Sequence, residues 1–281
     1  MNLRDLHDAL QQAVLLALRR FWGDTAMPRR LDMLVDEYWR RKRDASKNPL
    51  VKYGEKYFSQ NDEDGITLEI VRRIGVRQGR FAEFGVGDGL ENNTLILLAS
   101  GWSGIWIGGE DLAVKIPPGS AKLKFTKSWV TAENCAALLR DGLAGAGGLD
   151  LLSVDLDGND LFVLSALMKS GIRPSVVVAE YNGKFPPPIR WSIAYDPQHK
   201  WNHDDYQGAS LQSLRDTMGE HDYIPVACNV TGVNVFFVDA KFKDKFTDVP
   251  EKLEELFVPA DYSWFFGRGH RTSPKTVERM L

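Results

Sequence analysis

An acidic, glycine-rich loop follows an apolar run at residues 81–89, which read FAEFGVGDG. An apolar run that leads into glycines is typical of a buried parallel strand, and ligands bind at the carboxyl ends of such strands. Gly85, Gly87 and Gly89 would let the backbone turn tightly and approach a ligand closely. These residues predict a nucleotide-like cofactor at this loop.

The charge of this loop distinguishes between cofactors. Glu83 and Asp88 would repel a pyrophosphate, and the GxGxxG spacing of a phosphate-binding helix start is absent. The two carboxylates suit a cofactor with an amine and a sulfonium, which indicates S-adenosylmethionine. An ordinary glycine-rich strand end is the alternative. Glu110 ends the next apolar run about twenty residues further on, where an acid commonly binds ribose hydroxyls, although a surface acid would look identical.

A second group of acids lies in LLSVDLDGND, residues 151–160, at the end of another predicted strand. Asp155 lies there, and Glu180 and Asn182 end the neighbouring strand. Carboxylate and amide oxygens suit Mg²⁺, which would polarise an acceptor hydroxyl and ease its deprotonation. In the metal-free alternative, Asp155 binds the amine of the cofactor and Asp160 caps the following helix.

Residues 183–207 form a long connection rich in proline and aromatic residues. Long loops at the carboxyl edge of a sheet often build the acceptor pocket. His203 is the preferred general base and His199 the second candidate, because imidazole titrates near neutral pH. An exposed histidine without a role is the alternative for each. Trp191 and Tyr206 offer flat faces to a sugar ring, although core packing would explain them equally well.

The chain alternates between strand and helix signals from residue 80 onward. Helices are expected at 90–100, 132–144, 160–170 and 208–220, and strands at 80–86, 103–109, 121–127, 149–156 and 174–181. Two further strands, YIPVACNV and VNVFFVDAK, are separated only by Thr231 and Gly232, which predicts a hairpin. The fold class expected is α/β, a Rossmann-like doubly wound sheet of about seven strands, mostly parallel with an antiparallel C-terminal hairpin.

Residues 1–50 are expected to form an N-terminal helical arm, and residues 51–281 a single domain. Apolar residues recur at helical spacing in 3–21, and again in 31–39. The arm can pack on its own domain, form a dimer interface or lie on a membrane surface. We expect a homo-oligomer formed through the arm, with peripheral membrane contact as the open alternative.

The composition excludes several classes of protein. The chain has 281 residues, 43% of them hydrophobic, and a formal net charge of -3, which argues against nucleic-acid binding. Charges interrupt the apolar residues of the N-terminus, so neither a signal peptide nor a transmembrane segment is expected there. Cys135 and Cys228 lie in apolar stretches, which predicts buried free thiols in a reducing compartment. We therefore expect a cytoplasmic protein.

Six segments occur in a fixed order along the chain: YFSQNDEDG (57–65), FAEFGVGDG (81–89), LLSVDLDGND (151–160), VVVAEYN (176–182), GASL (208–211) and GVNVFFV (232–238). Together they resemble the FkbM-like class I S-adenosylmethionine-dependent O-methyltransferases. By this resemblance Gln60 and Asp64 would close over the cofactor, and Ser128 and Asn134 would lie near its adenine. The chain departs from the family pattern at Gly108, where Glu is common, and in the DLDGND motif, often written with Glu in place of Asp157. The resemblance covers about residues 55–240.

The expected function is methyl transfer from S-adenosylmethionine to a sugar hydroxyl of a glycan, polysaccharide or glycolipid, with or without Mg²⁺. Asp155 and Glu180 would act at the acceptor end, with His203 as the base. One alternative is methylation of a small-molecule natural product such as a macrolide sugar. The other is a catalytically silent module that binds a glycan or a protein partner.

Overall fold

The computed structural model describes residues 26–143, 148–261 and 272–281. The chain divides into two compact units, 1–45 and 46–281. In the first unit the described element is the helix α2 (Ala26–Ala45), which confirms the helix expected around residues 31–39. The helix expected within residues 3–21 lies outside the described residues. The role of the arm in oligomer formation stays a prediction.

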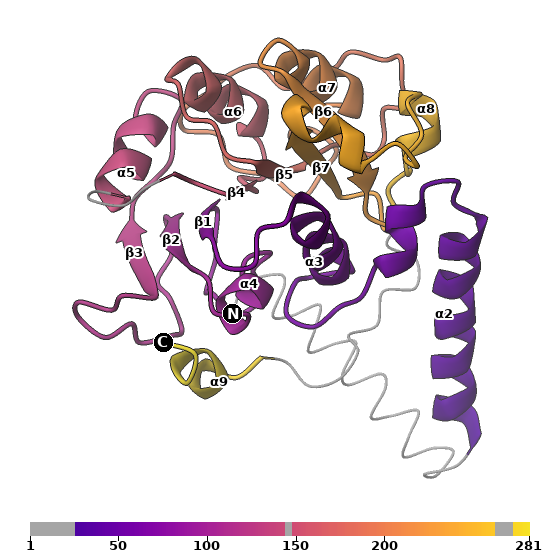
Figure 1. Ribbon diagram of the computed structural model, residues 1–281, viewed down its shortest axis with the longest axis horizontal. Coiled ribbons are helices and arrows are strands. Elements are labelled where there is room, and N and C mark those ends of the chain that lie inside the picture. The colour runs from indigo at the N-terminus through magenta and orange to yellow at the C-terminus, as the bar shows by residue number, and fades with distance from the viewer. Residues whose placement is uncertain (1–25, 144–147, 262–271) are drawn as a thin grey trace. The chain divides into compact units, whose positions relative to one another are not determined.

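The second unit is built on a seven-stranded sheet with the order β3-β2-β1-β4-β5-β7-β6. The first five strands pair in parallel, and β7 runs antiparallel to both of its neighbours (Figure 1). The expected fold class is therefore confirmed. The strands are β1 (Arg80–Phe84), β2 (Ser103–Gly108), β3 (Leu123–Lys127), β4 (Leu151–Val154), β5 (Val176–Glu180), β6 (Tyr223–Cys228) and β7 (Asn234–Asp239).

The connection between β6 and β7 is longer than the sequence predicted. It spans residues 229–233 instead of Thr231 and Gly232 alone. The side-chain oxygen of Asn229 accepts hydrogen bonds from the backbone N–H groups of Val233 and Asn234, both at 2.9 Å. These bonds close the turn around the Asn229 side chain, so regular strand pairing ends earlier than the apolar run does.

Helices cover both faces of the sheet, as the doubly wound fold requires. In Figure 1, α5, α6 and α7 lie along one face and α3 and α4 along the other. No helix in the described ranges is long and apolar enough to cross a membrane. The helices of this unit are α3 (Glu63–Ile74), α4 (Leu95–Ala99), α5 (Cys135–Gly142), α6 (Asp160–Lys169), α7 (Leu211–Gly219), α8 (Leu253–Leu256) and α9 (Pro274–Glu278), with 3₁₀ turns η1 (Pro49–Tyr53) and η2 (Ala240–Lys245).

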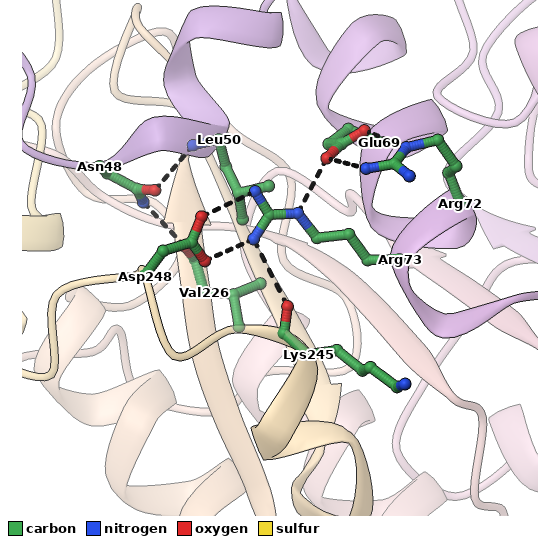
Figure 2. Close-up of polar contacts among 8 residues, drawn as sticks. All are labelled: Asn48, Leu50, Glu69, Arg72, Arg73, Val226, Lys245 and Asp248. Atoms are coloured by element: carbon green, nitrogen blue, oxygen red, sulfur yellow. Dashed lines mark hydrogen bonds and ion pairs between the residues drawn. The ribbon is translucent and has the colours of Figure 1, made fainter.

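The helix α3 was not predicted from the sequence, and polar contacts hold it in place (Figure 2). The Arg73 guanidinium donates to the buried Glu69 carboxylate at 2.9 Å and to both carboxylate oxygens of Asp248 at 2.6 and 3.0 Å. It also reaches the backbone oxygen of Lys245 at 3.5 Å. Nearby, the Asn48 side chain donates to the backbone oxygen of Val226 at 2.7 Å. Segments before β1 are thereby tied to segments of the C-terminal half.

The core lies between the sheet and its helices. Every residue of β4 and β5 is buried, which explains why these strands read as continuous apolar runs. Trp102, Trp106 and Phe81 are among the largest fully buried side chains. Cys135 and Cys228 are free and buried, as predicted. A packed central sheet gives the loops at its carboxyl edge a rigid base.

Candidate functional site

The predicted site residues gather at the carboxyl edge of the sheet. β1 pairs in parallel with both β2 and β4, and β4 pairs in parallel with β5. The loops that leave these strands therefore begin side by side along one edge, where open α/β sheets bind their ligands.

The glycine-rich loop combines tight packing with open space. A Cβ atom on Gly85, at φ +83°, would lie 1.5 Å from the backbone oxygen of Asp155, so only glycine fits there. Gly87 also has a positive φ, +49°, yet a Cβ atom on it would meet nothing within 4 Å. The loop thus packs against the loop after β4 at Gly85 and leaves room for a ligand at Gly87.

The departure from the family pattern at Gly108 has a local cause. A Cβ atom on Gly108 would lie 3.0 Å from a methyl group of Val86 and 3.3 Å from its backbone nitrogen. The glycine-rich loop therefore passes directly over the end of β2. A larger residue at this position would push the loop away from the strand.

Glu83 holds the loop through buried hydrogen bonds. Its carboxylate accepts from the backbone N–H groups of Asn93 and Thr94 at 2.9 and 3.1 Å, and from the Thr94 hydroxyl at 2.5 Å. Burial raises its pKa from 4.5 to about 7. Residues 93 and 94 are used in these bonds, so α4 begins later than the helix expected at 90–100. A direct contact between Glu83 and a cofactor stays a prediction.

The other predicted cofactor residues lie around this loop. Asp88 accepts a hydrogen bond from the backbone N–H of Leu90 at 3.0 Å, and Glu110 is exposed just after β2. The Ser128 hydroxyl donates to the backbone oxygen of Trp129 at 3.2 Å. The Asn134 side chain closes the turn before α5, because its amide donates to that same oxygen at 2.9 Å.

Asp64 organises the segment that precedes α3. One carboxylate oxygen accepts from the backbone N–H groups of Tyr57 at 2.7 Å, Phe58 at 2.5 Å and Ser59 at 2.9 Å. Burial raises its pKa from 3.8 to about 6. Gln60 is exposed in the same turn. The structure thus places Asp64 inside the protein, where it shapes the turn that carries Gln60.

Three carboxylates meet at the ends of β4 and β5. Oxygens of Asp155, Asp157 and Glu180 all lie within 4.8 Å of one another. Asp157 has a left-handed backbone, φ 53°, which a non-glycine residue seldom adopts. The carboxylate of Asp160 holds this turn through the N–H groups of Leu156 and Gly158, at 2.8 and 3.0 Å. A cluster of carboxylate oxygens at this spacing fits a hard divalent cation.

Asn182, the third metal ligand predicted from the sequence, has its polar atoms engaged elsewhere. Its amide donates to the backbone oxygens of Asp205 and Gln207, each at 3.0 Å. Its side-chain oxygen accepts from the backbone N–H of Lys184 at 3.1 Å. In these contacts Asn182 closes the base of the 183–207 loop, and Asp157 supplies the third carboxylate of the cluster.

The two candidate histidines differ in their surroundings. His203 is exposed, with φ 60° and its ring 4.7 Å from that of Trp201. His199 packs on the DLDGND turn, because a Cβ atom on Gly158 would lie 2.3 Å from its Cδ2 atom. The Nε2 atom of His199 is buried without a hydrogen-bond partner among the described residues. Only His199 of the two is thus held against the turn that carries the acids.

Three aromatic residues of the loop contact one another. The rings of Phe185 and Trp191 stack with centroids 4.3 Å apart, and Trp191 meets Tyr206 edge-on at 6.1 Å. Tyr206 remains 49% exposed.

A separate surface cavity of about 550 Å³ lies over residues 112–125, between β2 and β3. Its lining has no acid or histidine.

Sequence reasoning missed one residue of this edge. Trp129 is 48% exposed and lies against Gly109, just before Glu110. Trp129 could have been identified from the sequence, because it is a large aromatic residue two positions beyond the end of a predicted strand, in a segment that otherwise reads as a polar turn.

Comparisons with known proteins leave the chain without an assigned family. No protein-family model matches it, and no curated protein matches it in sequence. Solved structures with a similar fold include the MycE methyltransferase of the mycinamycin biosynthetic pathway, in complex with Mg, SAH and mycinamycin VI. It is 16% identical, with 62% of this chain and 45% of that chain covered and a TM-score of 0.33.

Two further structures resemble the chain at the same level. EvdMO1 is 14% identical, with 73% of this chain and 47% of that chain covered and a TM-score of 0.35. A third structure, from work on the conversion of a disulfide bond into a thioacetal group during echinomycin biosynthesis, is also 14% identical. It covers 73% of this chain and 90% of that chain, with a TM-score of 0.33. The chain spans less than half the length of the MycE and EvdMO1 chains. Such likeness carries no argument about activity.

Proposed function

We propose that this chain is an S-adenosylmethionine-dependent O-methyltransferase that acts on a sugar hydroxyl of a glycan, polysaccharide or glycolipid. The observation that carries the proposal is the open space above Gly87, which lies on the same sheet edge as the carboxylates of Asp155, Asp157 and Glu180. A ligand in that space would have one end at the glycine loop and the other at the acids.

The chemistry of this edge favours a cationic cofactor over a phosphate-bearing one. Asp88 lies within the loop and Glu110 beside it, and the loop itself carries no lysine or arginine. In our proposal Glu110 accepts the ribose hydroxyls, and in the absence of a cation Asp155 faces the amine of the methionine portion. S-adenosylmethionine supplies a methyl group activated by a sulfonium, so the chain's own residues need to align the donor and the acceptor.

Asp155, Asp157 and Glu180 would hold a divalent cation such as Mg²⁺. When bound, the cation would polarise the acceptor hydroxyl and lower the pKa of its proton. Asn182, whose hydrogen bonds are made to the backbone of the 183–207 loop, would position that loop beside the cation.

We assign the proton transfer to an imidazole of that loop. The methyl carbon leaves sulfur and bonds to the acceptor oxygen, and the hydroxyl proton passes to the ring nitrogen and then to solvent. His203 is the candidate that sequence reasoning favours. The position of His199 against Gly158, with its Nε2 atom buried, supports His199 as the base in its place.

The loop aromatic residues support a saccharide acceptor. Tyr206 and Trp191 meet edge to face, and Tyr206 keeps half of its surface exposed. A flat, partly exposed ring pair is suited to the C–H groups of a pyranose.

Calorimetry with S-adenosylhomocysteine tests the cofactor proposal, because the acid-lined loop should bind it without any acceptor. Absence of binding at millimolar ligand would refute the methyltransferase proposal. A radiolabelled methyl-transfer screen over oligosaccharides, lipid-linked saccharides and glycosylated natural products then identifies the acceptor. Binding without transfer to any acceptor would favour the silent module, and transfer only to a natural product would favour the small-molecule alternative.

A further inference from the structure

Trp129 occupies an unusual place for a large aromatic residue. It follows β3 by two residues and remains 48% exposed, at the same sheet edge as the glycine-rich loop. A half-exposed indole at a ligand-binding edge presents a flat apolar face to whatever binds there.

The ring of Trp129 lies against the backbone after β2. A Cβ atom on Gly109 would be 3.2 Å from Cε3 and 3.8 Å from Cζ3 of the indole. The backbone N–H of Ser128 donates to the oxygen of Gly108 at 2.9 Å, which holds the two strand ends together. The glycine pair therefore brings the indole next to Glu110, the residue to which we assign the ribose.

Residues 195–200 of the 183–207 loop, which we call the strap, fix the position of the indole. The Trp129 Nε1–H donates to the backbone oxygen of Pro197 at 2.7 Å. The exposed ammonium of Lys200 lies 5.7 Å from the ring centroid. One edge of the indole is thus hydrogen-bonded, which sets the plane of the ring.

The strap is itself anchored to the turns after β3 and β4. The Tyr195 hydroxyl donates to the Glu133 carboxylate at 2.5 Å and accepts from the backbone N–H of Ala132 at 3.1 Å. The side chain of Asn159 donates to the backbone oxygen of Asp196 at 2.7 Å. Two anchors directly before Pro197, at Tyr195 and Asp196, therefore support the bond to Trp129.

We propose that Trp129 is the surface on which the adenine ring of the cofactor stacks. This inference rests on the proposed function, because it needs a cofactor with a purine beside the ribose acid. A stacked aromatic ring binds the face of a base, and removal of such a ring typically weakens binding roughly tenfold or more. Because the strap orients the ring, the 183–207 loop also forms a wall of the cofactor site.

Two substitutions separate stacking from the role of the indole as a strap anchor. Trp129→Phe keeps an aromatic face and removes the Nε1 donor, whereas Trp129→Leu removes both. If the indole stacks on adenine, the Trp129→Phe variant should bind S-adenosylhomocysteine with a Kd within about threefold of wild type. The Trp129→Leu variant should bind it at least about tenfold more weakly. Adenosine should show the same loss with Leu, because it shares the purine and ribose. Trp201→Leu, in the same loop, is the matched control and should bind as wild type does.

The outcomes of this calorimetry are distinct. If wild type binds no S-adenosylhomocysteine, the proposed function fails and this inference fails with it. If wild type binds and the Leu variant binds equally well, the inference alone is wrong. Equal losses in the Phe and Leu variants, matched by Tyr195→Phe, would assign Trp129 to holding the strap and would overturn stacking. Thermal unfolding of each variant separates these results from loss of the fold.

Discussion

At the scale of single residues, Gly87 differs from the other glycines of its loop. Gly85 and Gly89 have close neighbours at 1.5 and 3.1 Å from an added Cβ, so packing alone explains them. Gly87 has a positive φ and no such neighbour. Open space at a glycine is not unusual by itself, but Gly87 lies in the loop that leaves β1 at the carboxyl edge of the sheet, where it leaves room for a ligand.

Gly87→Ala should therefore weaken the binding of S-adenosylhomocysteine at least about tenfold, because the methyl group enters the ligand space. Gly171→Ala is the matched control, since Gly171 also has a positive φ, +84°, and nothing within 4 Å of its Cβ position. Both variants should lose about 1 kcal/mol of folding free energy from backbone strain. Calorimetry distinguishes them, and equal affinities in the two variants would remove Gly87 from the site.

The two histidines of the 183–207 loop should differ in their effect on the rate of methyl transfer. His199→Gln should lower the rate of methyl transfer at least about a hundredfold. S-adenosylhomocysteine should bind as in wild type. His203→Gln, at the exposed position, should stay within about threefold of the wild-type rate. If instead the His203 variant loses the rate and the His199 variant keeps it, our assignment of the base to His199 is wrong.

At the scale of elements, buried carboxylates hold the loops around the site. Glu83 binds the start of α4, Asp64 binds residues 57–59 and Asp160 binds residues 156–158. Burial raises the pKa of Glu83 to about 7 and the pKa values of Asp64 and Asp160 to about 6. Each loop is thus positioned by an acid whose charge is costly to bury.

The pH dependence of stability follows from the sign of these shifts. The folded chain binds the Glu83 proton more tightly than the unfolded chain, so the stabilisation is complete below pH 4.5 and is lost as the pH rises through about 7. The free energy of unfolding of wild type, relative to Glu83→Gln, should fall by about 1–3 kcal/mol from about pH 5 to about pH 8. Urea unfolding at both values measures it, and a constant difference would contradict the raised pKa.

The anchoring of α3 supports another prediction at the element scale. Arg73 is 12% exposed and bonds both Glu69 and Asp248, whereas Arg72 is 70% exposed and bonds Glu69 alone. Arg73→Ala should cost about 2–3 kcal/mol of folding free energy, because it removes the bonds to Glu69 and to Asp248 together from a mostly buried position. Arg72→Ala is the control and should cost less than about 1 kcal/mol. Similar losses in both variants would show that Asp248 does not anchor the helix.

At the scale of the whole molecule, the sheet could be predicted from the sequence because its buried strands are continuous apolar runs. The helix α3 could not, since Glu63, Asp64 and Glu69 lie on its buried side and interrupt the apolar period. Asp155 and Glu180 were found because strand ends meet at one edge whatever path the loops take. The partners of Asn182 and the difference between His199 and His203 depend on the path of a 25-residue loop, on which periodicity carries no information.

Because the site draws on loops from β1 through β5, its ligand should stabilise the 46–281 unit as a whole. S-adenosylhomocysteine at about a hundred times its Kd should add about 2.7 kcal/mol to the free energy of unfolding and raise Tm by about 5 °C. NAD⁺ at the same concentration should leave Tm unchanged, because the loop carries Asp88 and lacks the GxGxxG spacing that binds a pyrophosphate. Differential scanning calorimetry measures both shifts, and a rise with NAD⁺ but none with S-adenosylhomocysteine would assign the glycine-rich loop to a dinucleotide.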